Sequence, residues 1–282
     1  MELTAGVTPG RPSVVIVPYK GLFQLDLPDI WRYRELLYFL VWKDILIRYK
    51  QTVIGMSWAI LQPLITMVIF TVIFGTLVHV PSDGTPYPIF AFAALLPWNF
   101  FSQALSRSGA SLVGNTNLIT KVYFPRLLIP LSSTISPVVD LFFSFLILLV
   151  LMPMYGIAPT WGLLLLPLFV MLTLATALAV GLWLTTLNVK YRDVGYVIPF
   201  LIQIWMYASP VVYPLSMVPA KWRLLYSLNP MVGIIEGFRW AIIGSGRPDV
   251  LSIVISSLVV VVLMAGGLIY FKNMEQTFAD II

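Results

Sequence analysis

Residues 42–64 read WKDILIRYKQTVIGMSWAILQPL, which places four charged side chains within nine residues directly before a long apolar run. Residues three and four positions apart share one face of a helix, so the spacing sorts this region into two faces. The apolar face holds Tyr38, Val41, Trp42, Ile45, Leu46 and Tyr49, and the polar face holds Lys43, Asp44, Arg48, Lys50 and Gln51. Asp44 precedes Arg48 by four residues, which is the favourable order for a helical ion pair. The pattern predicts an amphipathic helix over 31–50 that lies in a membrane interface and leads into a span.

Two roles remain open for this helix on its pattern alone. Trp31, Trp42 and Tyr49 suit the headgroup level, and the basic face can stay in the cytosol or meet anionic lipid, which favours a simple membrane anchor. The other role is a docking surface for a cytosolic partner.

The composition places most of the chain in lipid. Of 282 residues, 59% are hydrophobic and 10% charged, and the mean hydropathy is +0.93. Soluble domains are nearer a quarter charged. The excess of 17 basic over 12 acidic residues is typical of membrane topology and does not require a nucleic-acid partner. With no cysteine in the chain, disulfides and thiolate chemistry are excluded.

Six apolar stretches are long enough for spans, which need about 20 residues each. They are predicted at 53–78, 88–106, 127–152, 162–187, 194–213 and 251–271. Residues 1–30 contain four prolines and are expected to form an extended arm, and 273–282 form a short tail. The predicted fold class is an all-α integral membrane protein with a six-helix domain over 51–272.

Basic residues gather on one side of the predicted spans. Thirteen of the 17 lie before the first span, in the second and fourth joints, or near the C-terminus, whereas the joints at 79–87 and 153–161 hold none. By the positive-inside rule, this side and both termini are predicted to be cytoplasmic.

The connection over 214–250 is predicted to lie outside. Its second half, MVGIIEGFRWAIIG at 231–244, would reach only about 21 Å at about 1.5 Å per residue, short of a hydrocarbon core of about 30 Å. We therefore expect two short re-entrant or interfacial helices before the last span. Asn229 and Pro230 suit the start of the second one, and an ordinary capped surface helix is the alternative.

Within that second helix, two patterns predict contacts. Gly233, Gly237 and Ala241 recur every four residues, which gives a small face that another helix can approach closely. Glu236 and Arg239 are three residues apart and are expected to pair.

Signals of catalysis are absent from the sequence. It has no GxxxxGK[ST] loop and no HExxH motif, and His79 is its single histidine, so neither a Walker ATP site nor a zinc site is predicted. Asp140 lies in the third predicted span, where an ionised carboxylate costs on the order of 2.5–3.5 kcal/mol. It is expected either to face the bundle, water or a partner, or to sit in a first turn that reaches the cytosolic interface if Pro130 and Pro137 shift the helix start.

Aromatic residues, 14% of the chain, supply the remaining signal. One face of the fifth span carries Tyr196, Phe200, Gln203, Tyr207 and Pro210, and a weaker stripe on the first span carries Trp58, Gln62 and Thr66. Rings with scattered hydroxyl and amide groups can offer sliding contacts to sugars. Packing or an interfacial aromatic belt is the alternative.

Four motifs carry a resemblance to a known family. They are RELLYFLVWKDILIRYKQTVIGMSWAILQPL at 34–64, NTNLITKVYFPRLLIPLSS at 115–133, LNVKYRDV at 187–194 and SLNPMVGIIEGFRWAIIG at 227–244. In order and content they resemble the membrane subunit of ABC exporters of bacterial surface polysaccharide, which serve O-antigen, teichoic acid and related lipid-linked glycans. The resemblance covers about 31–272, and its first two motifs are the specific ones.

The resemblance implies a division of labour. Two permease chains would form a channel in the bacterial cytoplasmic (inner) membrane, and two separate ATPase subunits would bind ATP and Mg²⁺ and dock below it. The ATPase-coupling candidates are Lys43, Asp44, Arg48, Lys50, Asn115, Lys121 and Arg126. Helices at about 219–228 and 231–243 would resemble external gating helices, with Glu236 and Arg239 as gate candidates. The channel candidates for a lipid-linked polysaccharide are Trp58, Gln62, Tyr196, Phe200, Gln203 and Tyr207. No cofactor is expected on this chain.

Two other classes remain open. A permease of the same superfamily could export a drug or a lipid. A membrane-embedded glycan transferase would need acids or histidines grouped at one membrane face, and the sequence offers no convincing cluster of them.

Overall fold

The computed structural model describes residues 31–50, 57–244, 249–275 and 277–278, and every element in these ranges is a helix. The first half comprises α2 (Arg34–Lys50), α3 (Ser57–Phe70), the π-helix η1 (Thr71–Leu77), α4 (Tyr87–Gly114), α5 (Thr116–Lys121), α6 (Leu128–Ile135) and α7 (Val138–Met154). The second half comprises the 3₁₀-helices η2 (Trp161–Leu165) and η3 (Leu215–Met217), with α8 (Leu166–Lys190), α9 (Val194–Tyr207), α10 (Ala220–Tyr226), α11 (Pro230–Ile243) and α12 (Val250–Glu275). The predicted all-α class is confirmed. The predicted arm over 1–30 lies outside the described residues.

In the part of the chain that the structure describes, five helical segments are long and apolar enough to cross a membrane. They are Ile60–Leu77, Tyr87–Gly114, Leu128–Met154, Trp161–Lys190 and Val250–Glu275. Each overlaps a predicted span, and the second extends well beyond the predicted end at residue 106.

The fifth predicted span is shorter than expected. Helix α9 ends at Tyr207 after 14 residues, a rise of about 21 Å, and residues 208–213 form turns rather than helix. Proline disfavours the helical conformation of the residue before it, so Pro210 explains why the helix does not continue through Ser209. The apolar stretch at 194–213 therefore contains a short sixth apolar helix and a turn.

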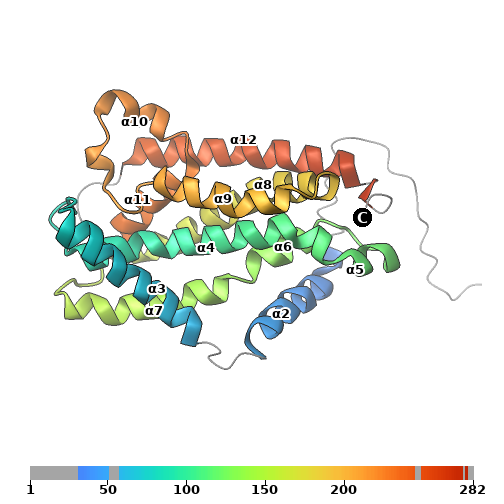
Figure 1. Ribbon diagram of the computed structural model, residues 1–282, viewed down its shortest axis with the longest axis horizontal. Coiled ribbons are helices and arrows are strands. Elements are labelled where there is room, and N and C mark those ends of the chain that lie inside the picture. Colours follow the sequence, from blue (N-terminus) through green and yellow to red (C-terminus); the bar gives the residue numbers. More distant parts are fainter. Residues whose placement is uncertain (1–30, 51–56, 245–248, 276, 279–282) are drawn as a thin grey trace, which may run out of the picture.

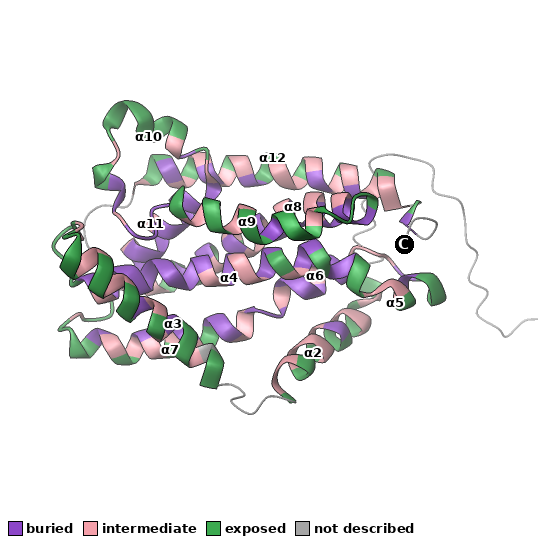
Figure 2. Ribbon diagram, in the orientation of Figure 1, coloured by how far each residue is buried: buried purple, intermediate pink, exposed green. Residues whose placement is uncertain are grey.

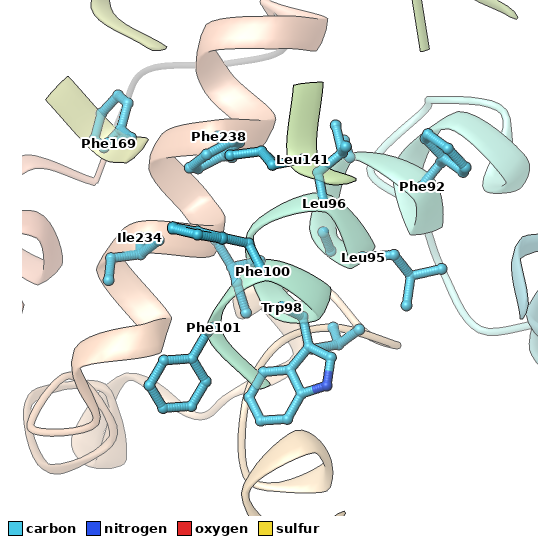
Figure 3. Close-up of a cluster of buried hydrophobic side chains, with 14 of the residues drawn as sticks. Phe92, Leu95, Leu96, Trp98, Phe100, Phe101, Leu141, Phe169, Ile234 and Phe238 are labelled. Atoms are coloured by element: carbon cyan, nitrogen blue, oxygen red, sulfur yellow. The ribbon is translucent and has the colours of Figure 1, made fainter. Parts of the chain in front are cut away.

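Helix α4 is the centre of the bundle and packs against α3, α6, α7, α8, α9 and α11. Its segment from Ile89 to Leu96 is buried throughout (Figure 2). Aromatic side chains of α4 contribute to an extended apolar cluster with Phe238 of α11 and Phe169 of α8 (Figure 3). In lipid, such contacts are favoured by close packing rather than by escape from water.

Small residues set the closest approach in this bundle. A Cβ atom at Gly181 of α8 would lie 2.4 Å from Ser108 Oγ of α4. Only glycine fits there, so the backbone of α8 can lie directly against the Ser108 side chain of α4.

Helix α11 is buried, so the alternative of an ordinary capped surface helix is wrong, and its predicted place near the outer membrane face stays a prediction. It packs among α4, α8 and α12, and most of its residues are inaccessible. The predicted cap is confirmed, since Asn229 Oδ1 accepts a hydrogen bond from Met231 N at 3.0 Å. The small face explains the burial, because a Cβ atom at Gly233 would lie 2.7 Å from the carbonyl oxygen of Ser252 on α12. The short helix α10, in contrast, is exposed and projects from the bundle (Figure 1).

Helix α2 lies at the same end of the bundle as α5 and the C-terminal end of α12 (Figure 1). Leu36, Leu37 and Leu40 pack against apolar residues around α6. Of the predicted apolar face, Tyr38, Trp42 and Leu46 are exposed and available to lipid. Val41, Ile45 and Tyr49 are half-buried, so that face is only partly outward.

Candidate functional site

The aromatic row of α9 points away from the rest of the chain. Tyr196 is 86% exposed, Phe200 64% and Tyr207 57%, and Gln203 is also exposed, whereas Ile198 on the opposite side is buried against α4 near Gly109. These four predicted channel residues therefore share an outward face, and no packing role among the described residues explains them.

The stripe on α3 is outward as well. Trp58 is 51% exposed and Gln62 is exposed. Helices α3 and α9 both pack on α4, so the two predicted rows are carried by helices that share one neighbour.

A polar stripe on α4 was not predicted. Asn99, Ser102, Gln103 and Ser106 follow helical spacing within a membrane span and are partly or fully exposed. Polar side chains in a span are expected to face water or protein rather than lipid. The spacing could have been read from the sequence, but Ser, Asn and Gln are also common at buried helix contacts, so burial was needed to single it out.

A small cavity connects this stripe to charged residues. Its lining includes Gln62, Asn99 and Gln103, together with Arg48 and Asp140. It lies where α3, α4 and α7 meet the end of α2. Gln62, Asn99 and Gln103 therefore lie near the Arg48–Asp140 pair, in a cavity that is also lined by Leu96, Phe100 and Leu141.

Asp140 is the centre of a charged cluster at that end. It lies in the first turn of α7 and is 5% exposed. Arg48 of α2 forms an ion pair with its carboxylate, and the Tyr49 hydroxyl donates a hydrogen bond to it. Asp140 faces the protein, as the first expectation required, and it also lies in a first turn. Whether that turn reaches the cytosolic interface stays a prediction.

The predicted pair between Asp44 and Arg48 is wrong. Arg48 turns to Asp140, while Asp44 Oδ1 lies 3.8 Å from Lys43 Nζ. An exposed helical pair gives only about 0.3–0.5 kcal/mol, whereas a buried carboxylate without a partner costs far more. The polar face of α2 consequently turns partly toward the bundle, not entirely toward solvent or headgroups as predicted.

Helix α2 makes a second polar contact with the bundle. Lys43 Nζ donates a hydrogen bond of 3.1 Å to Asn115 Oδ1, at the junction of α4 and α5. Near these contacts, Arg107 Nη1 of α4 donates to Ser136 Oγ at 3.3 Å.

Burial raises the pKa of Asp44, although the charges of Lys43 and Arg107 oppose this shift. Burial and the hydrogen bond to Asp140 raise the pKa of Tyr49 to about 12, so this hydroxyl stays protonated at neutral pH.

The other coupling candidates do not join the cluster. Lys50 and Lys121 are exposed. Arg126 is tied to the end of α12, where its backbone N–H donates to Glu275 Oε1 at 3.2 Å and its guanidinium to the Glu275 carbonyl. Their predicted contacts with an ATPase stay predictions.

The predicted pair on α11 is confirmed. Arg239 Nη1 lies 3.1 Å from Glu236 Oε1. The guanidinium also donates to the carbonyls of Val211 at 2.9 Å and Tyr213 at 3.4 Å. Burial raises the pKa of Glu236, and the nearby Arg239 charge opposes that shift. The pair joins α11 to the turns after α9, and its role as an external gate stays a prediction.

The helices that are long and apolar enough to cross a membrane define a multi-pass membrane protein. Residues 35–243 match the model of the ABC-2 type transporter family, and the chain belongs to this family. Within the described ranges, no group of three His, Asp or Glu residues is arranged to hold a metal ion.

Curated relatives are similar over nearly their whole length. The O-antigen export system permease protein RfbA of Myxococcus xanthus is 30% identical over 256 residues, which is 89% of this chain and 97% of the relative. A protein of the same name from Klebsiella pneumoniae is 27% identical over 88% of this chain and 95% of its own length. The polysialic acid transport protein KpsM of Escherichia coli is 23% identical over 83% of this chain and 91% of its own length.

Proposed function

We propose that this chain is the membrane subunit of an ATP-driven exporter, and that two copies form a channel for a lipid-linked polysaccharide of the O-antigen type. The observation that carries the proposal is the outward row of Tyr196, Phe200, Gln203 and Tyr207 in a chain whose relatives are polysaccharide-export permeases. A second copy placed against this face would enclose it.

The chemistry of these faces suits a glycan. Aromatic rings contact the C–H faces of sugars, and the tyrosine hydroxyls and glutamine amides exchange hydrogen bonds with sugar hydroxyls. The polar stripe of α4, from Asn99 to Ser106, adds further donors and acceptors between α3 and α9. Such contacts are individually weak and repeated, which allows a long polymer to move stepwise while its lipid carrier remains at the membrane edge.

The ATPase is a separate partner in this proposal, because the chain has no GxxxxGK[ST] loop. Two ATPase subunits would bind ATP and Mg²⁺ and dock at the end that carries α2 and α5. The concentration of basic residues on this side supports a cytoplasmic location for it and for both termini, with the chain in a bacterial inner membrane. Exposed Lys50 and Lys121 are then available for contact with the ATPase.

The external end would be closed by α10, α11 and the turns between α9 and α10. Glu236 and Arg239 hold the turns against α11 through the carbonyls of Val211 and Tyr213. The pair is therefore assigned to fixing the external gate rather than to contact with the glycan.

The path can be tested by thiol accessibility, because the chain has no cysteine of its own. In the assembled complex, Gln203→Cys or Ser102→Cys should react with a water-soluble thiol reagent. Leu258→Cys, on the exposed face of α12, should face lipid and react slowly. Equal reaction rates at all three positions would contradict a hydrated path between α4 and α9.

A permease for a drug or lipid is the alternative within the same superfamily. Such a permease would need an apolar binding surface rather than a row with amide and hydroxyl groups. Gln203 on α9 and the polar residues Asn99 and Gln103 on α4 therefore discriminate between a glycan permease and a drug or lipid permease. Substitution of Gln203, Asn99 and Gln103 by leucine should impair glycan export. If the chain were instead a permease for an apolar drug or lipid, the same substitutions would leave its transport intact.

A further inference from the structure

The last turn of α2 is fastened to the first turn of α7. Arg48 and Tyr49 are adjacent on α2, and both bind the carboxylate of Asp140, which lies 91 residues beyond Tyr49 in sequence. The contact is therefore not a local one between neighbouring turns of a single helix. It is a tertiary link between a helix at the end of the bundle and a membrane span.

The charges make this link costly to open. The Asp140 side chain is 7% exposed. The charge of Arg107 also acts on this carboxylate, but Arg107 donates to Ser136, two residues before α7, and the ion pair is made by Arg48. Separation of α2 from α7 would leave a buried carboxylate without Arg48, and the cost of an unpaired buried charge is large even where the intact pair adds little net stability.

We propose that Arg48 and Asp140 are positioning residues that make α2 and α7 move as one unit, so that force applied to α2 reaches a second span besides α3. The proposal deepens the proposed function and rests on it, because it requires a partner that moves α2. It also revises the role of Arg48, which is an internal link and not a contact to the ATPase.

The link can be tested by distances between spin labels in the complex with the ATPase. Cysteines at the exposed positions Tyr38 of α2 and Val150 of α7 carry the labels, and labelled chains are diluted with unlabelled ones so that distances within one chain dominate. We expect the Tyr38–Val150 distance to stay unchanged when a non-hydrolysable ATP analogue is added. In the Asp140→Asn variant, and in Arg48→Gln as the matched change on α2, the ATP analogue should shift or broaden the Tyr38–Val150 distance distribution.

The charge swap separates a specific link from a general loss of folding. Arg48→Asp with Asp140→Arg restores the opposite charges in reversed order and should restore the fixed distance, whereas each reversal alone should not. Arg34→Gln removes an exposed charge from α2 away from Asp140 and should behave like the wild type. Only complexes that elute intact are compared.

Export per ATP hydrolysed gives a second measurement. It should fall about tenfold in Asp140→Asn, within the usual range for coupling between two sites, and recover in the swap. The proposal is overturned if the wild-type distance changes with nucleotide, if Asp140→Asn keeps the wild-type distance, or if the swap is no better than the single reversals. Absence of glycan movement by the wild type would instead refute the proposed function, and the distances would still test the link.

Discussion

Arg239 is held on both sides of its guanidinium, with Glu236 Oε1 3.1 Å from Nη1 and the Phe90 ring centroid 3.7 Å from Cζ. Because the side chain is also bonded to backbone carbonyls, it joins α11 to α4 and to the turns after α9. A planar guanidinium with five donors suits this position, and a lysine ammonium cannot reach the same set of acceptors.

Arg239→Gln is therefore expected to destabilise the chain by about 3 kcal/mol, because it removes a buried guanidinium and leaves half-buried Glu236 without its partner. Arg239→Lys should recover only part of this loss. Thermal unfolding of the purified protein in detergent measures both, and Arg223→Gln on exposed α10 is the control. Equal midpoints for the Arg239 and Arg223 variants would contradict the assigned role.

The small face of α11 gives a second prediction. Gly233→Ala places a Cβ atom against backbone atoms of α12 at 2.7–2.9 Å, so α11 must shift, at a cost of about 1–3 kcal/mol. Gly114→Ala is the matched control, since nothing lies within 4 Å of its Cβ position. Unfolding midpoints should fall for the first variant only, and a lowered midpoint for Gly114→Ala of the same size would argue against steric crowding as the cause.

The aromatic row should affect transport more than folding. Tyr196→Ala with Tyr207→Ala removes two exposed rings, so assembly with the ATPase and the unfolding midpoint should change little while glycan export slows. Phe92→Ala, in the buried cluster around α4, should instead lower stability by about 3–5 kcal/mol. Wild-type export by the double tyrosine variant would remove the row from the proposed path.

Asp44 gives a pH-dependent prediction. Its pKa is raised by burial, so the folded chain holds this proton more tightly than the unfolded chain. The resulting stabilisation is complete below the unfolded pKa of about 3.9 and is lost as the pH rises through the folded value. Asp44→Asn should therefore gain stability relative to the wild type between about pH 4 and pH 7. Unfolding midpoints of both proteins across this range test it, and a difference independent of pH would contradict the sign.

Several features of the fold follow from local patterns in the sequence. The lengths of the apolar stretches predicted the long spans, and the Asn229-Pro230 pair predicted the start of α11. The spacing of Glu236 and Arg239 predicted their contact, and the period of Tyr196, Phe200 and Tyr207 placed them on one face. In each case the determining residues lie within one helix, where spacing alone fixes the geometry.

The remaining features depend on contacts between helices. Arg48 could pair locally with Asp44, but the buried carboxylate of Asp140 requires a partner more strongly. Helix α11 is short and carries two charges, which suggested an interface, yet its burial is possible because Arg239 finds carbonyl acceptors in turns far along the chain. The α4 stripe became recognisable only when its exposure was known.

ATP-dependent movement of glycan is the most direct test of the central claim. The chain is co-expressed with its ATPase partner and reconstituted into vesicles, and the transfer of a lipid-linked polysaccharide across the bilayer is measured beside that of an apolar drug-like compound. We expect ATP to drive transfer of the glycan and not of the drug, and a catalytically inactive ATPase to abolish it. Transfer of the drug without the glycan by an intact, ATP-hydrolysing complex would contradict the proposed function.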